Sequence, residues 1–436
     1  MEAQLSQVSK GCFEVGDRLE AFVVGAEVKR GRKWREMKRV NRCFDGADAH
    51  GKNVVIRYRF QLAEAAAPLG PRQRRPVWED RGAYHVAPSA WLLRPTARTS
   101  GALRLRVDTP PGLWFVSGLP RVGATEYEGR LEYIDSTPYS VLSPSAPSVM
   151  RVGGGEIEWV VLPGELPYPI DTVERWIERA ARAIVGYFGR LPVPRVALLV
   201  TPAGEAPAPA WGGSTMGYVG ASIRVRAGKT LPVEADEDWI LTHELVHLAL
   251  PNLPLEHRWM EEGLATYVEP IVRRRAGMMS AEAAWANLWR GMPQGLPAAE
   301  DEGLDRIGAL GRRQAWGRTY WGGALFWMMA DVELLEKTEG RVGLDDVLRG
   351  ILREGDIRTR WELPHLLDVA ERASGVPVLR QLHERLAAAP GRPDLDALWN
   401  RLGVSERDGR MVLDDAAPRA WIRRRVMGEG EVEPTR

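Results

Sequence analysis

The chain has 436 residues, 44% of them hydrophobic and 27% charged, and its 59 basic and 58 acidic residues leave a net charge of +1. The length predicts two or three globular domains with cores of ordinary composition. The balanced charge argues against a general role in binding nucleic acid or a membrane surface. We find no apolar stretch long enough to cross a bilayer and therefore expect no membrane span.

The start of the chain carries neither the basic residues nor the apolar core of a signal peptide. As written, the sequence predicts a cytoplasmic protein; a periplasmic or secreted one is expected if a leader has been removed. The two cysteines, Cys12 and Cys43, have no metal-ligand spacing with a partner. Either one disulfide or two reduced core thiols fits them, and both stay open.

Residues 1–166 have the pattern of a β-rich domain. Residues 54–62 and 103–108 alternate apolar and polar side chains with a period of two, which is typical of half-buried strands. Glycine and proline interrupt the region, and residues 63–80, with clusters of alanine, proline and arginine, are expected to form a loop. We predict a β-sandwich-like N-terminal domain with a structural or substrate-positioning role, because no catalytic group of residues stands out in it.

A helix and two strands are predicted next in the chain. Apolar residues recur at helical spacing over 171–189, behind a capping box that begins at Asp171. Residues 196–200 form an apolar run typical of a buried strand. Residues 212–217 are expected to be a flexible, glycine-rich piece before a strand at 221–226.

The following predicted helix carries two histidines and a glutamate. His243 and His247 lie four residues apart, which on an α-helix puts both imidazoles on one face, one turn apart. Two imidazoles so arranged can bind one Zn²⁺, and Glu244 can act as general base on a water that the metal activates. Acidic residues at 236–238 and Pro251 mark the two ends of this mostly apolar helix.

A catalytic zinc site with two histidines needs a third protein ligand and one open position. Leu250 and Leu253 occupy the places where a metzincin has its glycine and third histidine, so that arrangement is excluded. His257 lies on a proline-rich connection, whereas Glu262 begins a second apolar helix after enough chain for a loop back to the metal. We therefore predict Glu262 as the third ligand and keep His257 as the weaker candidate.

The sequence His-Glu-Leu-Val-His at 243–247, followed by Trp-Met-Glu-Glu-Gly-Leu-Ala-Thr-Tyr at 259–267, resembles the gluzincin zinc peptidases, in particular the aminopeptidase N and glycyl aminopeptidase families. The resemblance implies that Glu262, directly before the glycine, is the third ligand of one Zn²⁺. It also implies a thermolysin-like catalytic domain over 167–275 and a peptide or protein substrate. The connection between the two motifs is shorter than in aminopeptidase N, which alters the rim of the predicted site.

In these families the last strand before the zinc helix is an open sheet edge that pairs with the substrate, which here implies the strand at 221–226. In aminopeptidase N a Gly-Ala-Met-Glu-Asn motif at this edge supplies a glutamate that holds the free amine of the substrate. The matching stretch here, Gly-Gly-Ser-Thr-Met-Gly at 212–217, has no glutamate, and Glu205 and Glu234 in the flanking loops have no specific claim. An aminopeptidase with another amine anchor and an endopeptidase therefore both stay open.

The helix that carries Glu262 continues, and the chain beyond residue 273 has helical patterning throughout. Glu269 lies two turns after Glu262 on the same face, where it would either support a histidine ligand or be solvated. We predict an α-helical subdomain over 276–427 that completes the active site, and a disordered tail over 428–436.

Thr-Tyr-Trp-Gly-Gly-Ala at 319–324 begins a strongly apolar helix of this subdomain. It resembles the Tyr-x-x-Gly element of the same families, whose tyrosine stabilises the tetrahedral intermediate. The resemblance implies that the phenol of Tyr320 donates a hydrogen bond to the developing oxyanion. Aromatic packing at a helix start is the alternative. Arg318, Tyr218 and His257 are weaker candidates for the wall of the pocket.

The sequence therefore predicts a multidomain α+β protein that acts as a zinc metallopeptidase, with Glu244 activating water and Tyr320 and the metal holding the oxyanion. An aminopeptidase is one form of this activity. Two alternatives stay open: a binding or scaffold protein that keeps the zinc fold without turnover, and a zinc hydrolase that acts on a non-peptide substrate. The sequence predicts no particular oligomeric state.

Overall fold

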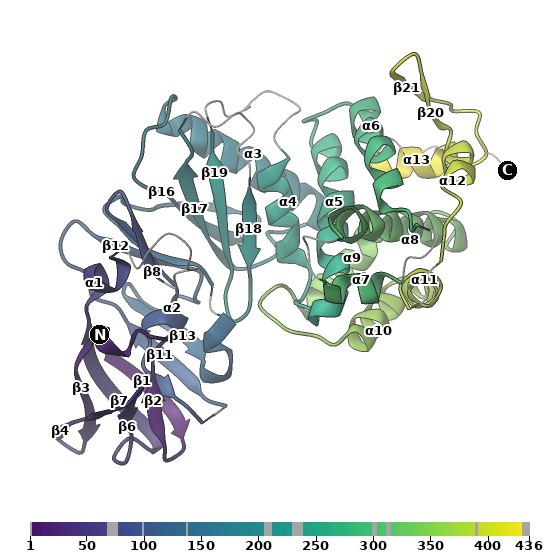
Figure 1. The fold of residues 1–436 in the computed structure, drawn as a ribbon. Coiled ribbons are helices and arrows are strands. Elements are labelled where there is room, and N and C mark those ends of the chain that lie inside the picture. The colour runs from purple at the N-terminus through teal and green to yellow at the C-terminus, as the bar shows by residue number, and fades with distance from the viewer. Residues whose placement is uncertain are drawn as a thin grey trace. The chain divides into compact units, whose positions relative to one another are not determined.

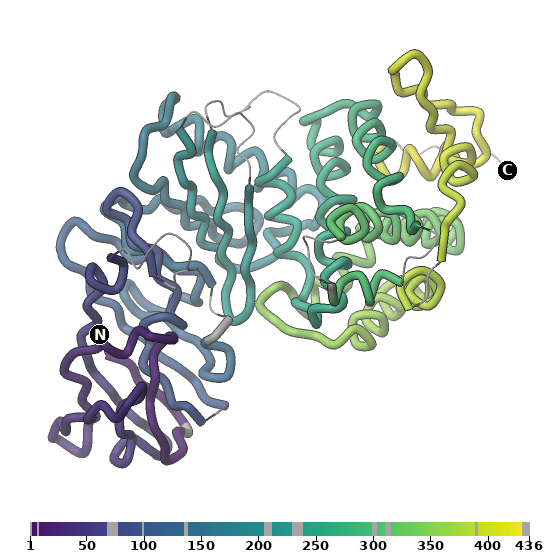
Figure 2. Tube along the Cα trace, viewed as in Figure 1, coloured from purple at the N-terminus to yellow at the C-terminus, as the bar shows by residue number. Residues whose placement is uncertain are grey.

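The computed structural model divides into two compact units, drawn as a ribbon in Figure 1 and as a tube in Figure 2. The first unit comprises Met1–Arg151, Glu156–Pro167 and Arg195–Lys229, and the second comprises Val152–Gly155, Tyr168–Pro194 and Thr230–Arg436. The domain boundaries predicted from the sequence stay a prediction. The structure describes residues 2–67, 77–97, 100–136, 138–204, 212–228, 239–298, 303–310, 315–388 and 391–429.

None of the helices in these described ranges combines the length and the hydropathy that a membrane span requires.

Three antiparallel sheets form the N-terminal part of the first unit. A six-stranded sheet has the order β13-β11-β1-β7-β3-β4, and two four-stranded sheets have the orders β10-β2-β6-β5 and β12-β14-β9-β8. The predicted β-rich domain is thereby confirmed. The strands are β1 (Glu2–Val8), β2 (Cys12–Glu14), β3 (Val23–Arg30), β4 (Lys33–Glu36), β5 (Arg39–Val40), β6 (Cys43–Asp45), β7 (Gly51–Phe60), β8 (Val77–Asp80), β9 (Ala83–Val86), β10 (Arg94–Pro95), β11 (Ala102–Arg106), β12 (Trp114–Ser117), β13 (Glu126–Arg130) and β14 (Ser140–Ser143).

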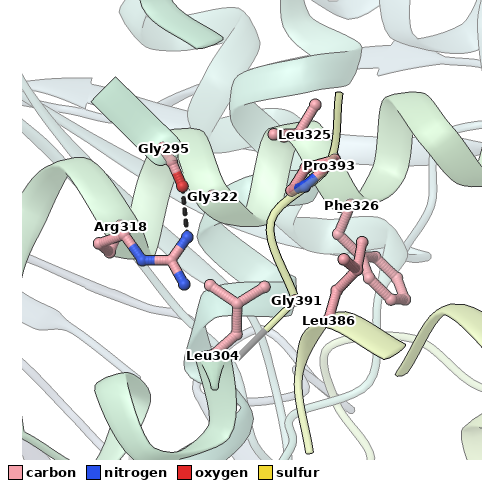
Figure 3. Close-up of a pocket in the computed structure, with 9 residues that line it drawn as sticks. All are labelled: Gly295, Leu304, Arg318, Gly322, Leu325, Phe326, Leu386, Gly391 and Pro393. Carbon is pink, nitrogen blue, oxygen red and sulfur yellow. Dashed lines mark hydrogen bonds between the residues drawn. The ribbon is translucent and has the colours of Figure 1, made fainter. Parts of the chain in front are cut away.

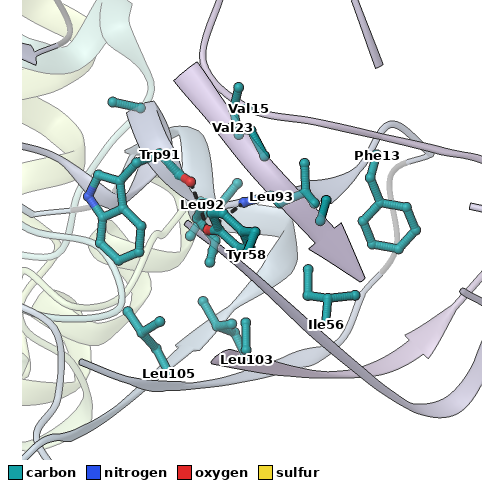
Figure 4. Close-up of a cluster of buried hydrophobic side chains, with 14 of the residues drawn as sticks. Phe13, Val15, Val23, Ile56, Tyr58, Trp91, Leu92, Leu93, Leu103 and Leu105 are labelled. Carbon is teal, nitrogen blue, oxygen red and sulfur yellow. Dashed lines mark hydrogen bonds between the residues drawn. The ribbon is translucent and has the colours of Figure 1, made fainter. Parts of the chain in front are cut away.

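Strand β7 shows how the alternating sequence builds the core of these sheets. Val54, Ile56 and Tyr58 are buried, while the residues between them are exposed or half-buried. Figure 4 shows Tyr58 among the buried side chains, where its hydroxyl donates to the Trp91 carbonyl at 2.7 Å and accepts from the Leu93 amide at 3.0 Å. Burial raises the pKa of Tyr58 well above its usual range, so this hydroxyl stays a neutral donor that ties β7 to the segment beside it.

The structure of the first unit contradicts the loop predicted over residues 63–80 and decides between the two alternatives for the cysteines. The loop predicted over 63–80 is wrong at both ends, because Leu62–Ala66 forms helix α1 and Val77–Asp80 forms β8. Alanine is the strongest helix former, and two alanines of α1 are buried, so this run folds into a helix. Residues 68–76 lie outside the described ranges. Cys12 and Cys43 form a disulfide between β2 and β6, with their Cα atoms 5.8 Å apart.

A mixed five-stranded sheet, of order β15-β16-β17-β19-β18, completes the first unit. Strands β16, β17 and β19 run parallel, and β18 pairs antiparallel to β19. The predicted buried strand at 196–200 is confirmed within β17. The strands are β15 (Ser148–Val152), β16 (Gly155–Val161), β17 (Arg195–Pro202), β18 (Gly213–Met216) and β19 (Ser222–Ala227).

The edge of this sheet differs from the prediction. Residues Gly213–Met216 were expected to be flexible but form the outer strand β18, and β19 is an inner strand between β17 and β18. Gly213 lies opposite Val225 and Met216 opposite Ser222, so the four central residues of the glycine-rich piece all pair with β19. Glycine, serine and threonine give little apolar alternation, and the sequence pattern therefore missed a strand that backbone hydrogen bonds alone define.

The second unit is mainly helical, as predicted for the C-terminal part of the chain. Helix α3 begins at Ile170, one residue before the predicted capping box, and Pro169 rather than an acidic side chain precedes it. It ends at Phe188, and the left-handed φ of 80° at the next residue, Gly189, suits glycine. The helical prediction is wrong in one place, because Val404–Arg407 and Arg410–Leu413 pair as the hairpin β20–β21.

The helices of this unit lie in sequence order as follows: α3 (Ile170–Phe188), α4 (Ile240–Val246), α5 (Arg258–Arg275), α6 (Ala281–Gly291), α7 (Leu304–Leu310), α8 (Gly323–Lys337), α9 (Leu344–Glu354), α10 (Leu363–Ser374), α11 (Val378–Leu386), α12 (Leu395–Leu402) and α13 (Ala420–Met427). Short 3-10 turns are η3 (His247–Ala249), η4 (Leu255–His257) and η5 (Met292–Gly295), and η6 (Arg318–Gly322) is a π-helical turn that leads into α8. Figure 1 shows α5 and α8 packed side by side in this unit.

Candidate metal centre

Helix α4 carries the first histidine and the candidate base. All seven of its residues are buried, including His243 and Glu244, which are only 6% and 7% exposed. The predicted helix is shorter than expected, because α4 ends at Val246 and His247 begins the 3-10 turn η3. The backbone of His247 stays right-handed, so the two imidazole rings still lie one turn apart, with centroids 5.0 Å apart. The acidic residues at 236–238 lie outside the described ranges.

Helix α5 brings Glu262 to these histidines. Its Oε2 atom lies 3.5 Å from Nε2 of His247 and 3.8 Å from Nε2 of His243. The other oxygen, Oε1, faces Nε of Arg258 at 3.6 Å. The next residue, Gly263, packs against Gly323 of α8 so closely that a Cβ atom would overlap its backbone. Helices α5 and α8 can therefore touch directly beside Glu262.

The His-His-Glu cluster, His243, His247 and Glu262, has the geometry of an uncomplexed zinc site. Their ligand atoms all lie within 4.8 Å of one another. Ligands about 2.0–2.1 Å from a tetrahedral Zn²⁺ lie roughly 3.3–3.4 Å apart, close to the two distances measured here. Both distances exceed the usual range of about 2.7–3.2 Å for an N–H···O hydrogen bond. Two imidazoles and a carboxylate are donors that zinc prefers, so these residues fit one Zn²⁺.

The charge around the cluster also favours a cation. Burial by itself lowers the pKa of His247, but the contact with Glu262 and the negative charges of Glu262, Glu244 and Glu261 raise it overall. Carboxylates that favour a charged imidazolium also favour a divalent ion at the same place.

Tyr320 lies beside the cluster on the π-helical turn η6. Its ring is half-buried and stacks on the ring of His243, with centroids 6.3 Å apart and an interplanar angle of 16°. Single π-helical turns occur frequently at functional sites. The structure therefore brings together four segments of the chain that sequence alone could only align by motif: α4, η3, α5 and η6.

Solved zinc peptidases have a similar fold. An aminopeptidase N family protein from Idiomarina loihiensis superposes with a TM-score of 0.60 at 13% identity, covering 92% of this chain and 74% of that chain. A two-domain M1 zinc metallopeptidase variant bound to L-arginine gives a TM-score of 0.53 at 16% identity and covers 90% of both chains. An M1 zinc metallopeptidase variant from Deinococcus radiodurans, bound to the substrate Tyr-Ser-Ala, gives 0.52 at 14% identity, also over 90% of both chains.

The chain has a gluzincin aminopeptidase-like fold. The resemblance that the motifs predicted is thereby confirmed at the level of fold, together with the multidomain α+β class. No family model matches the sequence, and no curated protein matches it. At 13–16% identity these likenesses describe the fold alone.

The connection between η3 and α5 is fixed at several points. The Leu253 amide donates to Oε1 of Glu261 at 2.8 Å, and burial raises the pKa of that carboxyl group. The Asn252 amide donates to the Thr359 carbonyl at 2.9 Å, and the Trp361 amide donates to the Asn252 carbonyl at 3.0 Å. These bonds hold the connection in the position from which α5 starts.

Two weaker candidates for the wall of the pocket, Arg318 and Tyr218, have contacts outside the His-His-Glu cluster. Arg318 is directed into a cavity of ≈ 10 Å³, about the room of one water molecule, and donates to the Gly295 carbonyl (Figure 3). Tyr218 belongs to the first unit, where its ring lies 4.2 Å from that of Tyr133.

Glu269 is buried and accepts a hydrogen bond from Arg273 at 2.7 Å, so the prediction that it could be solvated is wrong. Burial raises the pKa of Glu269, and Arg273 opposes that rise.

His257, the other candidate for the third ligand, belongs to a second group. Its Nδ1 atom lies 2.8 Å from Oδ1 of Asp305, and Nε2 of His383 lies 2.8 Å from Oδ2 of the same residue. The indole of Trp259 also donates to Oδ1 at 2.9 Å. We call His257, Asp305 and His383 the His-Asp-His cluster. Residues 48 and 78 positions apart meet in it, and no local pattern predicted that meeting.

Sequence reasoning also missed two tryptophans beside the site. The ring of Trp239 meets His243 edge-on at 5.6 Å, and the ring of Trp316 stacks on Tyr320 at 5.4 Å. The signal was present in the sequence, because each tryptophan lies four residues before the residue that it contacts.

Proposed function

We propose that this chain is a zinc-dependent peptidase in which His243, His247 and Glu262 hold one Zn²⁺. The observation that carries the proposal is the pair of distances from Glu262 Oε2 to the two imidazoles, which are too long for hydrogen bonds and right for shared coordination. The fold likeness supports the same conclusion, since the neighbouring structures are described as zinc metallopeptidases.

The proposed reaction adds water to a peptide carbonyl and breaks the C–N bond. A bound zinc ion supplies Lewis-acid chemistry, which polarises the carbonyl and makes water more acidic. Glu244 accepts the proton that the water loses and passes it to the amine that leaves. Tyr320 donates a hydrogen bond from its phenol to the oxyanion that develops on the carbonyl oxygen. Glu244 lies next to a ligand on α4, and Tyr320 stacks on that same ligand, which supports both roles.

Release of N-terminal residues is the form of the activity that we propose to test first. Two structures of this fold hold L-arginine and the tripeptide Tyr-Ser-Ala. This chain lacks a glutamate at 212–217, so a different group would have to hold the free amine. A peptide pair with a free and an acetylated N-terminus decides between the modes: a loss of cleavage on acetylation supports an aminopeptidase, and equal cleavage supports an endopeptidase.

The main test is a screen of fluorogenic peptides with the zinc-loaded protein and its Glu244→Gln variant. We expect hydrolysis that a chelator abolishes and that added zinc restores. The Glu244→Gln variant should bind one zinc ion yet lose about 10²–10⁴-fold in rate, because the substitution removes the general base. Undiminished hydrolysis in this variant would falsify the base assignment. A zinc-loaded protein without any peptide hydrolysis would instead favour the scaffold role or a non-peptide substrate.

A further inference from the structure

Two exposed tryptophans flank the candidate site. Trp239 and Trp316 are 43% and 52% exposed, whereas every other described tryptophan of the second unit is buried or half-buried. Each lies one helical turn before a residue of the site, Trp239 before His243 and Trp316 before Tyr320. The same local geometry thus carries both indole rings to the metal centre from two separate segments of the chain.

The four rings form one continuous row. Trp239 meets His243 edge-on at 5.6 Å and 88°, His243 stacks on Tyr320 at 6.3 Å and 16°, and Tyr320 stacks on Trp316 at 5.4 Å and 26°. The two inner rings belong to a proposed zinc ligand and the proposed oxyanion donor. The two outer rings have no role in that chemistry, yet they are the exposed ones.

The exposure of the indole rings of Trp239 and Trp316 requires an explanation. A large aromatic side chain is normally buried, because burial removes much apolar surface from water. Indole rings that stay exposed beside a site are rigid apolar surfaces, since only two side-chain torsions need to be fixed on binding. The contacts with His243 and Tyr320 already hold Trp239 and Trp316 in position, so they can bind a ligand without a large loss of conformational freedom.

We infer that Trp239 and Trp316 are specificity-determining residues that bind large apolar or aromatic substrate side chains on either side of the scissile bond. The inference rests on the proposed function. A carbonyl within hydrogen-bond reach of Tyr320 and next to His243 would be one ring away from each indole. The substrate residues before and after that carbonyl are therefore the ones within reach of the two exposed rings.

The test uses two sets of peptides: in one set only the residue before the cleaved bond is varied among Ala, Leu, Phe and Arg, and in the other set only the residue after it. We expect the wild type to prefer Phe and Leu in kcat/KM. The Phe-to-Ala ratio should fall about tenfold in one peptide set with Trp239→Ala and in the other set with Trp316→Ala, a usual effect of lost apolar contacts in a substrate pocket. Trp316→Phe should restore most of it. The control is Trp114→Ala, an equally large change at an exposed tryptophan of the first unit.

Two results would overturn the inference while peptide hydrolysis stands. One is an unchanged Phe-to-Ala ratio in both alanine variants, and the other is a wild-type preference for Arg over Phe and Leu. Zinc content and circular dichroism check that each variant is folded. If an alanine variant is not folded, leucine at the same position replaces it, because leucine keeps an apolar side chain but removes the flat ring.

A binding measurement separates failure of the inference from failure of the proposed function. Phenylalanine hydroxamate and alanine hydroxamate are titrated into the zinc-loaded Glu244→Gln variant with and without Trp316→Ala, by calorimetry. A preference for the phenylalanine compound that falls about tenfold with Trp316→Ala supports the inference even if no peptide is cleaved. Equal affinities for the two hydroxamates in the presence of both tryptophans overturn it.

Discussion

The described residues of the second unit include two clusters of two histidines and one carboxylate, which differ in how the acid meets the histidines. In the His-His-Glu cluster a single oxygen, Oε2 of Glu262, faces both imidazoles at 3.5 and 3.8 Å. The side chains are 13% exposed or less. At these distances the three ligand atoms leave room for the metal ion that we propose, which would account for the burial of these polar groups together.

In the His-Asp-His cluster each oxygen of Asp305 serves a different histidine, and both distances are 2.8 Å. These side chains are 14–24% exposed. Paired hydrogen bonds satisfy the groups without an ion, so the same residue types form a bridge between η4, α7 and α11. Residue type alone therefore does not distinguish the two clusters. The oxygen of Glu262 that both histidines share, and its longer distances to them, do distinguish them.

The largest expected difference between the clusters is in metal content. Glu262→Ala removes the converging oxygen and should reduce zinc from one ion per chain to almost none after dialysis, as measured by elemental analysis. His383→Ala is the matched variant in the other cluster and should keep one zinc ion. Full zinc occupancy in Glu262→Ala, or two ions in the wild type with one lost in His383→Ala, contradicts the comparison.

The second-largest effect is expected on kcat when Tyr320 is changed, because its ring stacks on that of His243 in the His-His-Glu cluster. Tyr320→Phe should lower kcat by about 10²–10³-fold, the usual loss for one oxyanion donor, with zinc content unchanged. The control is Tyr187→Phe, which removes a buried phenol of the same unit that lies under Arg275. Equal kcat values for Tyr320→Phe and the wild type would leave the ring with a packing role.

The His-Asp-His cluster should matter for stability. Asp305→Asn keeps the shape of the side chain but leaves His257, His383 and Trp259 without a charged acceptor. We expect a loss of about 1.5–3 kcal/mol in the free energy of unfolding, as for hydrogen bonds to charged groups, and full zinc content. Urea unfolding with elemental analysis measures both quantities. A loss of zinc without a loss of stability contradicts this division of roles.

The smallest effect is the acid dependence of that stability. Burial raises the pKa of Asp305, but hydrogen bonds from His257, His383 and Trp259 outweigh it and hold the pKa well below its usual range. A carboxyl group with a lowered folded pKa stabilises the fold above its unfolded pKa, about 3.9, and this contribution is lost as the pH falls towards the folded pKa. The free-energy gap between wild type and Asp305→Asn should therefore be full above about pH 4 and shrink below it. A gap that stays constant down to about pH 3 contradicts the assignment.

The chemistry-bearing helices could be predicted from the sequence because their signals are local. The spacing of His243 and His247 fixes a shared helix face. Glu262 with Gly263 indicated a second helix, although that helix begins earlier than predicted, at Arg258. Hydrophobic periodicity likewise predicted α3 and the buried strand β17. These features depend on residues within one or two turns of each other, so tertiary packing did not override them.

The remaining features depend on distant partners. Asp305 meets His257 and His383 across 48 and 78 positions, and nothing near Asp305 in the sequence marks that meeting. The edge strand β18 has no apolar alternation and is defined by its pairing with β19. In each case the deciding interaction is non-local.

The contact between Gly263 and Gly323 has a consequence for how the site tolerates change. A side chain between two helices can rearrange to absorb a shift, but two backbones in contact have nothing to rearrange. The direct contact between the two helix backbones therefore sets the distance between Glu262 and the turn that carries Tyr320. One added methyl group at Gly263, which touches neither metal nor substrate, would widen that spacing at a cost of about 1–3 kcal/mol. Gly263, which has no reactive group, therefore determines how precisely Glu262 and Tyr320 are positioned relative to each other.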